Sequence, residues 1–222
     1  MKISLTQTEA RVLGVLLEKA VTTPDQYPLS LNAVTTGCNQ KSNRDPVTDI
    51  DQTEAIAALD VLVGKHLIRE RSDAGSRVAK YLHRLSGSLG LTYDFKEEEL
   101  AILCVLLLRG PQTVGEIRVR TGRLFAFAGL GEVEQVLERL GVHCDGPYVR
   151  CLDREPGRKE ARYMHLLCED GAGLAGAAIA SEVHVSASQA REHSAAELNT
   201  GTRLAQLEHE VSQLRRELAD LK

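Results

Sequence analysis

A glycine-rich run is the first pattern in this 222-residue chain that could do cofactor chemistry. Residues 171–176 read Gly-Ala-Gly-Leu-Ala-Gly, the G-x-G-x-x-G spacing that lets a backbone approach a pyrophosphate at a helix N-terminus. That chemistry also needs a second parallel strand after the helix, and the sequence that follows has no strand pattern. We therefore interpret residues 171–196, which are rich in Gly, Ala and Ser, as a flexible linker.

Histidines and cysteines gather toward the end of the globular sequence, where they could bind a metal ion. They are His143, Cys144, Cys151, His165 and Cys168. Their spacings do not resemble the close ligand pairs of zinc sites, and single cysteines behave as small hydrophobic residues. The chain also has no P-loop, no G-x-S-x-G and no H-E-x-x-H. We expect no metal, no cofactor and no enzymatic activity.

A dense polar segment at residues 39–45 is the strongest candidate for contact with a nucleic acid or a partner. The side chains in question are those of Asn39, Gln40, Lys41, Asn43 and Arg44. Asn and Gln can read adenine edges, whereas Lys and Arg can read guanine or hold phosphate. The alternative is a structural loop that caps the flanking helices and pairs Arg44 with a nearby carboxylate.

Further basic side chains lie on two predicted hairpins. The candidates are Arg69, Arg71, Arg77 and Lys80 on the first and Arg154, Arg158 and Lys159 on the second. Arg118, Arg120 and Arg123 are predicted to lie between the second and third helices of the second repeat. They could follow a phosphate backbone, or they could be solvated charges paired with neighbouring acids. The net charge of −4 shows no basic excess of the kind that DNA binding usually brings.

Capping signals predict three helices before residue 65, at about residues 7–22, 31–36 and 52–64. Thr6 and Glu9 fit a capping box at the start of the first, and Gly37 is expected to stop the second. Strands are predicted at residues 67–71 and 78–85, joined by a polar turn. Three helices followed by a hairpin is the order of a winged-helix domain.

The same pattern occurs a second time. Residues 99–107, 136–140 and 161–167 echo residues 9–17, 58–62 and 79–85 in the same order. We therefore predict a mainly α, α+β fold with two tandem winged-helix domains, at residues 1–86 and 91–170.

Three segments give the sequence a specific family resemblance. Residues 22–32 read TTPDQYPLSLN, residues 38–47 read CNQKSNRDPV, and residues 76–81 read SRVAKY. In these segments the chain resembles the YceH family, and the resemblance extends over nearly its whole length. It implies two winged-helix domains in a bacterial cytoplasmic protein without an established biochemical activity.

The last part of the chain is predicted to be a coiled-coil helix at residues 197–222. Its apolar seam consists of Leu204, Leu207, Val211, Leu214, Leu218 and Leu221. The residues that flank this seam would pair with opposite charge in a parallel dimer, so we expect a homodimer; the alternative is a helix that folds back on its own domain. Five scattered cysteines and the absence of a signal peptide or a membrane-length apolar run predict a cytoplasmic protein that does not enter a membrane.

The two helices expected to face a DNA groove carry the wrong charge for it. The first exposes Thr53, Glu54, Ala57, Asp60 and Val61, and the second exposes Glu132, Glu134, Gln135, Glu138 and Arg139. Carboxylates repel phosphates, which argues against base reading by these helices. Two hypotheses therefore remain: association with double-stranded DNA through the hairpins and the polar loop, or a scaffold on which the winged helices dock a protein partner.

Overall fold

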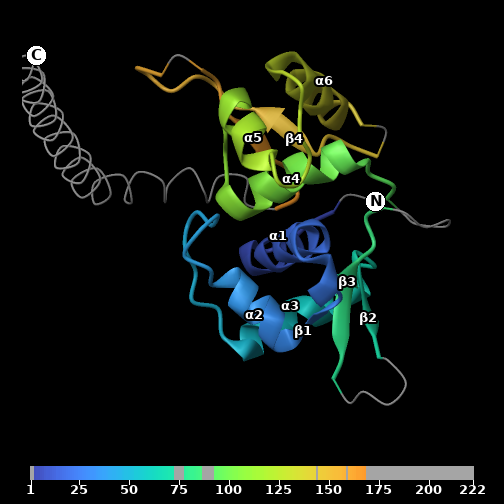
Figure 1. The fold of residues 1–222 in the computed structure, drawn as a ribbon. Coiled ribbons are helices and arrows are strands. Elements are labelled where there is room, and N and C mark those ends of the chain that lie inside the picture. Colours follow the sequence, from blue (N-terminus) through green and yellow to red (C-terminus); the bar gives the residue numbers. More distant parts are fainter. Residues whose placement is uncertain (1–2, 73–77, 87–92, 144, 159, 169–222) are drawn as a thin grey trace, which may run out of the picture. The chain divides into compact units, whose positions relative to one another are not determined.

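The computed structural model describes residues 3–72, 78–86, 93–143, 145–158 and 160–168 (Figure 1). Within these ranges the chain has an α+β fold, with six α-helices and two small antiparallel sheets. The predicted linker at residues 171–196 and the predicted coiled coil at residues 197–222 lie outside the described residues.

The first half begins with a helix and ends with a hairpin. Its elements are α1 (Gln7–Thr22), a 3-10 turn (Pro24–Gln26), β1 (Leu29–Ser30), α2 (Leu31–Cys38), α3 (Gln52–Gly64), β2 (Ile68–Arg71) and β3 (Lys80–His83). The strands form an antiparallel sheet in the order β1-β3-β2. The short strand β1 was not predicted, because two residues are too few to show an alternating pattern.

The second half repeats this plan with a two-stranded sheet. Its elements are α4 (Glu97–Arg109), α5 (Val114–Thr121), α6 (Leu130–Gly141), β4 (Val149–Cys151) and β5 (Tyr163–His165). The predicted repeat of three helices and a hairpin is therefore present in the described residues. The strands of the first hairpin are shorter than the predicted segments 67–71 and 78–85, since the ladder pairs only residues 68–71 with residues 80–83.

Local sequence determines where most helices begin. The Thr6 hydroxyl accepts from the Glu9 amide and Glu9 reaches back to the Thr6 amide, which confirms the predicted capping box. Asp51 and Glu54 form the same arrangement at the start of α3. Each pair satisfies amides that the first turn of a helix leaves without intrahelical partners.

The predicted end of α2 was wrong, because the helix continues through Gly37 to Cys38. A Cβ atom on residue 37 would lie 2.6 Å from Val15 Cγ1 in α1. Gly37 therefore allows two helices to approach each other, and it does not end one.

The first helices of the two halves, α1 and α4, pack against each other in the middle of the structure (Figure 1). The Cys104 thiol donates to the Gly14 carbonyl, and these two residues occupy equivalent positions in the repeat. A Cβ on Gly14 would lie 2.9 Å from Leu108 Cδ2, so a glycine is needed for this close approach. Buried side chains of both halves form one continuous core.

The start of the chain also joins the second half. The Leu5 amide donates to the Leu167 carbonyl at 2.7 Å, and Leu5 forms a parallel bridge with Cys168. The two halves are thus held together by the packing of α1 on α4 and by a main-chain hydrogen bond from Leu5 to Leu167. No helix in the described part of the chain is both long and apolar enough to cross a bilayer.

Candidate nucleic-acid and partner interface

The polar loop at residues 39–45 turns most of its side chains inward. Asn39 Nδ2 donates to the Ile50 carbonyl at 2.7 Å, and Asn39 Oδ1 accepts from the Ile50 amide at 2.8 Å. Gln40 Oε1 accepts from Lys19 and Arg44. These contacts fix the path of the chain between α2 and α3, so Asn39 and Gln40 have structural partners.

Arg44 is the most deeply buried member of this loop, with a side chain that is 0% exposed. Its guanidinium donates to both carboxylate oxygens of Glu18, at 2.6 and 3.2 Å, and to the carbonyl oxygens of Gly37 and Asn43. This is the structural alternative that the sequence left open, in which Arg44 pairs with a nearby carboxylate. Arg44 is therefore not available to an external phosphate, whereas Lys41 is exposed.

The hairpin of the first half carries its basic side chains on one face. Antiparallel register places Arg71 directly opposite Lys80, and Arg69 opposite Leu82. Side chains alternate between faces along a strand, so Arg69, Arg71 and Lys80 share the face opposite to that of buried Ile68 and Tyr81. Arg69 and Arg71 are exposed and Lys80 is half-buried, while Arg77 lies outside the described residues.

A like-charged pair directly across two strands is destabilising unless something compensates it. On its other side Lys80 faces Ser30 of β1. Arg69, Arg71 and Lys80 therefore define one outer face of the first sheet, which carries three basic side chains.

The hairpin of the second half offers less positive charge than that of the first, because one of its arginines is paired with a carboxylate. Arg158 is exposed, but its Nε lies 2.7 Å from a carboxylate oxygen of Glu155. Arg154 is exposed, and Lys159 lies outside the described residues. An exposed ion pair has little net charge to offer a phosphate, so Arg154 is the main cation here among the predicted residues of this hairpin that the structure describes.

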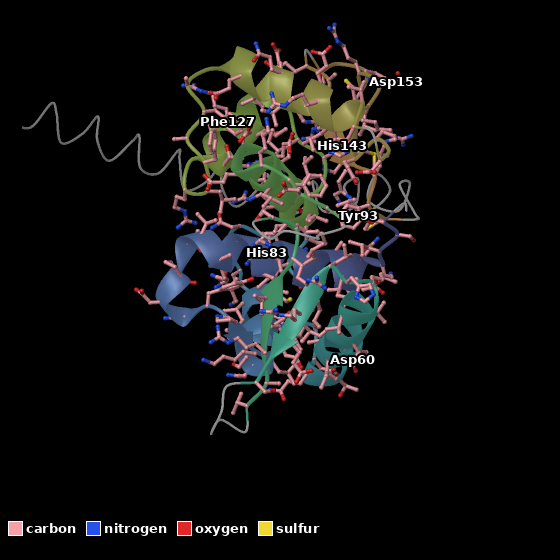
Figure 2. The ribbon with its side chains drawn as sticks, turned by 90° about the vertical axis from the view of Figure 1, so that its right-hand side faces the viewer. Asp60, His83, Tyr93, Phe127, His143 and Asp153 are labelled. Atoms are coloured by element: carbon pink, nitrogen blue, oxygen red, sulfur yellow. The ribbon has the colours of Figure 1, made fainter. Side chains whose placement is uncertain are left out.

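The third helices present the surfaces that the sequence predicted. On α3, Thr53, Glu54, Ala57, Asp60 and Val61 are all exposed, and Asp60 can be found in Figure 2. On α6, Glu134, Gln135 and Glu138 are exposed, and Glu132 is half-buried. Arg139 is exposed but lies 3.0 Å from Glu98 of α4, so its charge is already compensated.

One property of α3 was not singled out from the sequence. Ile56 is 39% exposed and Val61 is 42% exposed, with Ala57 exposed between them. Ala57 and Val61 were predicted to be exposed, whereas Ile56 was not, because α3 has apolar residues outside its buried positions and is only weakly amphipathic. This weak amphipathicity is the signal from which a further exposed apolar side chain could have been expected.

The histidines and cysteines of the second half lie in different surroundings and do not form one cluster among the described residues. His143, labelled in Figure 2, packs edge-on against Tyr148 at 5.0 Å between ring centroids and lies 5.8 Å from Phe95, on which Tyr93 stacks. His165 is buried on β5 and Cys151 is exposed on β4. Among the residues that the structure describes, no group of three or more His, Cys, Asp or Glu has a metal-binding arrangement.

Three arginines converge in a place that the sequence did not indicate. One of them, Arg120, belongs to α5, as does Arg118, so these two do not lie between the second and third helices of this half as predicted. Arg120, Arg123 and Arg109 of α4 line one pocket of about 290 Å³. Arg109 could not be recognised from the sequence, because its neighbourhood depends on how α4 packs against α1 and α5.

The predicted dimerisation seam, from Leu204 to Leu221, lies outside the described residues. Its six apolar positions and its complementary charges therefore remain a prediction.

Comparisons with known proteins agree with the family resemblance of residues 22–47. A UPF0502 protein of Vibrio parahaemolyticus is 47% identical over 222 residues, which is 100% of this chain and 96% of the relative. A UPF0502 protein of Pectobacterium atrosepticum is 46% identical over 221 residues, covering 100% and 99% of the two chains. One from Klebsiella pneumoniae is 52% identical over 170 residues, covering 77% and 78%.

A family model described as "Protein of unknown function, DUF480" matches residues 5–158. That match covers α1 to α6 and β4, and therefore the helices and hairpin strands from which the candidate interface is built. The resemblance to the YceH family is confirmed, and the chain belongs to the DUF480 family of bacterial UPF0502 proteins.

Proposed function

We propose that this protein is a non-enzymatic tandem winged-helix protein that associates with double-stranded DNA through the phosphate backbone. The contact surface is the outer face of the first sheet, formed by Arg69, Arg71 and Lys80. The observation that carries this proposal is the antiparallel register, which places Arg69, Arg71 and Lys80 on one face of the sheet, where they can contact successive phosphates.

The order of the elements supports a winged-helix assignment for each half. In the first half a short strand, β1, precedes the second helix and pairs with β3 of the hairpin, which gives the strand order β1-β3-β2. In DNA-binding proteins built in this way, the third helix enters the major groove while neighbouring elements contact the backbone.

The charges on α3 and α6 argue for a mode without base reading. Glu54 and Asp60 project from α3, and Glu134 and Glu138 project from α6. Carboxylates at a groove floor repel the flanking phosphates, so the affinity has to come from backbone contacts and is expected to be independent of sequence. A parallel dimer through Leu204–Leu221 would present two such faces.

We expect weak, strongly salt-dependent binding to any duplex. Three neutralised phosphates give a slope of about −2.7 in log K against log salt, so affinity should fall about 40-fold between 50 and 200 mM salt. The double variant Arg69→Gln, Arg71→Gln should reduce the magnitude of that slope by about 2 and weaken binding about tenfold or more at 50 mM salt. Fluorescence anisotropy on a random 20-base-pair duplex measures both quantities.

The matched control is Arg118→Gln with Arg150→Gln, which removes two exposed charges from α5 and β4. It should retain the wild-type slope. Equal weakening in the two double variants would assign the effect to net charge and overturn the proposal, as would an absence of binding at 50 mM salt.

A second candidate function is favoured by the exposed apolar side chains of α3. Ile56, Ala57 and Val61 lie beside the carboxylates of Glu54 and Asp60. A protein segment with an apolar face bordered by Lys or Arg would complement this surface in both shape and charge. In this alternative the first half docks a protein, as a scaffold would.

We expect the double variant Ile56→Asp, Val61→Asp to lose such partners without loss of fold, since both side chains are exposed. Affinity capture from a bacterial lysate, quantified by mass spectrometry, should show proteins retained by the wild type and lost with this variant. Leu130→Asp with Val142→Asp is the control, because both side chains are exposed outside α3. Identical eluates from the two double variants would exclude docking on α3.

A further inference from the structure

The pocket of about 290 Å³ near the end of α4 is lined by residues of both halves. Glu18 and Thr22 come from α1 and Asn43 from the polar loop, while Arg109, Arg120 and Arg123 come from α4, α5 and the turn after α5. Its remaining walls are apolar and consist mainly of Val105, Leu108, Val119 and Leu124.

The carboxylates near this pocket are already engaged. Glu18 accepts both terminal guanidinium nitrogens of Arg44, at 3.2 and 2.6 Å. Glu116 pairs with Arg120 Nη2 at 3.3 Å. These ion pairs compensate Arg44 and one side of Arg120, and they leave the charges of Arg109 and Arg123 without a carboxylate at ion-pair distance within the described residues.

Apart from the contact of Arg120 with Glu116, the hydrogen bonds of the pocket arginines lead to neutral groups. Arg109 Nη2 donates to the side-chain oxygen of Asn43, and Arg120 Nη1 donates to that of Gln112. Arg123 is exposed and has no hydrogen-bond or ion-pair partner among the described residues. A guanidinium has five donors, so each of these side chains can still donate toward the pocket.

Burial, followed by the charges of Arg120 and Arg44, lowers the pKa of Arg109, while Asp45 and Glu18 act in the opposite direction. The net direction shows that burial and the neighbouring arginines outweigh these two carboxylates. Arginines in the last turn of a helix do interact favourably with its dipole, which accounts for their position in the sequence. The dipole gives no reason for guanidinium groups from two helices and a turn to converge on one cavity.

We propose that this pocket binds a phosphorylated small molecule, with its phosphoryl group held by Arg109, Arg120 and Arg123. Guanidinium groups match the geometry of phosphate oxygens and bind them with charge-assisted hydrogen bonds. The apolar wall formed by Val105, Leu108, Val119 and Leu124 is suited to the organic part of such a ligand. A volume of about 290 Å³ is at the small end of ligand pockets, which limits the ligand to the size of a small metabolite.

This site is separate from the proposed DNA contact. The outer face of the first sheet lies on β2 and β3, whereas the pocket is formed by α1, α4 and α5. Because α1 belongs to the first half and α4 and α5 to the second, a ligand here would bridge the two halves of the fold.

The test is calorimetric titration of the full chain at constant ionic strength, with inorganic phosphate and phenyl phosphate as probes. Both should bind, and phenyl phosphate should bind more tightly because its ring covers the apolar wall. At ten times the dissociation constant, phenyl phosphate should raise Tm by about 3–6 °C. Arg123→Gln should weaken both probes about tenfold, since it removes charge-assisted hydrogen bonds to the phosphoryl group.

Arg118→Gln is the matched control, because Arg118 is an exposed arginine of α5 that does not line the pocket. It should bind both probes as the wild type does. Absence of heat and of thermal stabilisation with both probes would overturn the proposal, and so would equal weakening by Arg118→Gln and Arg123→Gln. If phosphate binds tightly and phenyl phosphate has no higher affinity, the proposal that the ligand has an organic part against the apolar wall is wrong.

Discussion

Replacement of Arg44 by Ala is expected to lower the free energy of unfolding by about 3–5 kcal/mol. The guanidinium is fully buried and is the partner of both Glu18 oxygens, of the Gly37 carbonyl and of the Asn43 carbonyl. Its removal leaves the buried Glu18 carboxylate with only the more distant Lys19 Nζ, at 3.7 Å, and leaves two carbonyl oxygens without this donor. Urea unfolding followed by circular dichroism at pH 7 measures the loss.

The ion pair between Arg44 and Glu18 can be separated from the rest of the network by a double-mutant cycle. Glu18→Gln alone and together with Arg44→Ala should show a coupling energy of about 1–3 kcal/mol, because the two charged groups are in direct contact. Arg118→Ala, on an exposed arginine, is the control and should change stability by no more than about 0.5 kcal/mol. A loss below about 1 kcal/mol for Arg44→Ala would mean that the loop does not depend on this side chain.

The second large effect is loss of stability in mild acid through His165. Burial lowers the pKa of His165 to about 4, against about 6.5 for an unfolded histidine. Its Nδ1 atom is buried without a hydrogen-bond partner in the described residues. Between these two pKa values the unfolded chain binds a proton that the folded chain does not, so stability is full above pH 6.5 and falls as the pH approaches 4.

We expect His165 alone to lower the free energy of unfolding by about 2–3 kcal/mol between pH 7 and pH 4.5. Burial also lowers the pKa of His83, which adds a loss of the same sign. His165→Leu keeps a side chain of similar volume without a titrating group. The decrease in the free energy of unfolding between pH 7 and pH 4.5, called the acid loss below, should therefore be smaller in this variant by about the same 2–3 kcal/mol. Denaturant unfolding at the two pH values measures the difference.

His66→Asn is the control for this experiment. His66 is exposed and has a positive φ of 59°, a conformation that asparagine tolerates. The acid loss in this variant should equal that of the wild type. If His165→Leu shows the same acid loss as His66→Asn, His165 is not the group responsible.

Capping residues show why so much of the helical structure could be predicted. Thr6 with Glu9 and Asp51 with Glu54 each satisfy amides within three residues of themselves. Such contacts depend only on neighbours in the sequence, so a single chain reveals them. The internal repeat in turn predicted the order of helices and hairpins in the second half.

Arg44 and Gly37 show why the candidate site was harder to predict. The sequence offered Arg44 as a contact residue or as the partner of a carboxylate, and the choice depended on Glu18, which lies 26 positions away. Glycine commonly ends a helix, yet the role of Gly37 is to leave room for Val15 on another helix. In both cases the deciding neighbour is distant in the sequence.

The sequence by itself predicted the three helices of the first half, the two hairpins, the repeat, the family and the acidic character of the helices expected to face a groove. These properties follow from short-range spacing and from residue type. Only the tertiary structure decided which polar side chains are buried, that α1 packs on α4, and that Arg109, Arg120 and Arg123 share one pocket. The physical reason is that burial and charge repulsion depend on distances between elements, and those distances arise only when the two halves pack around one core.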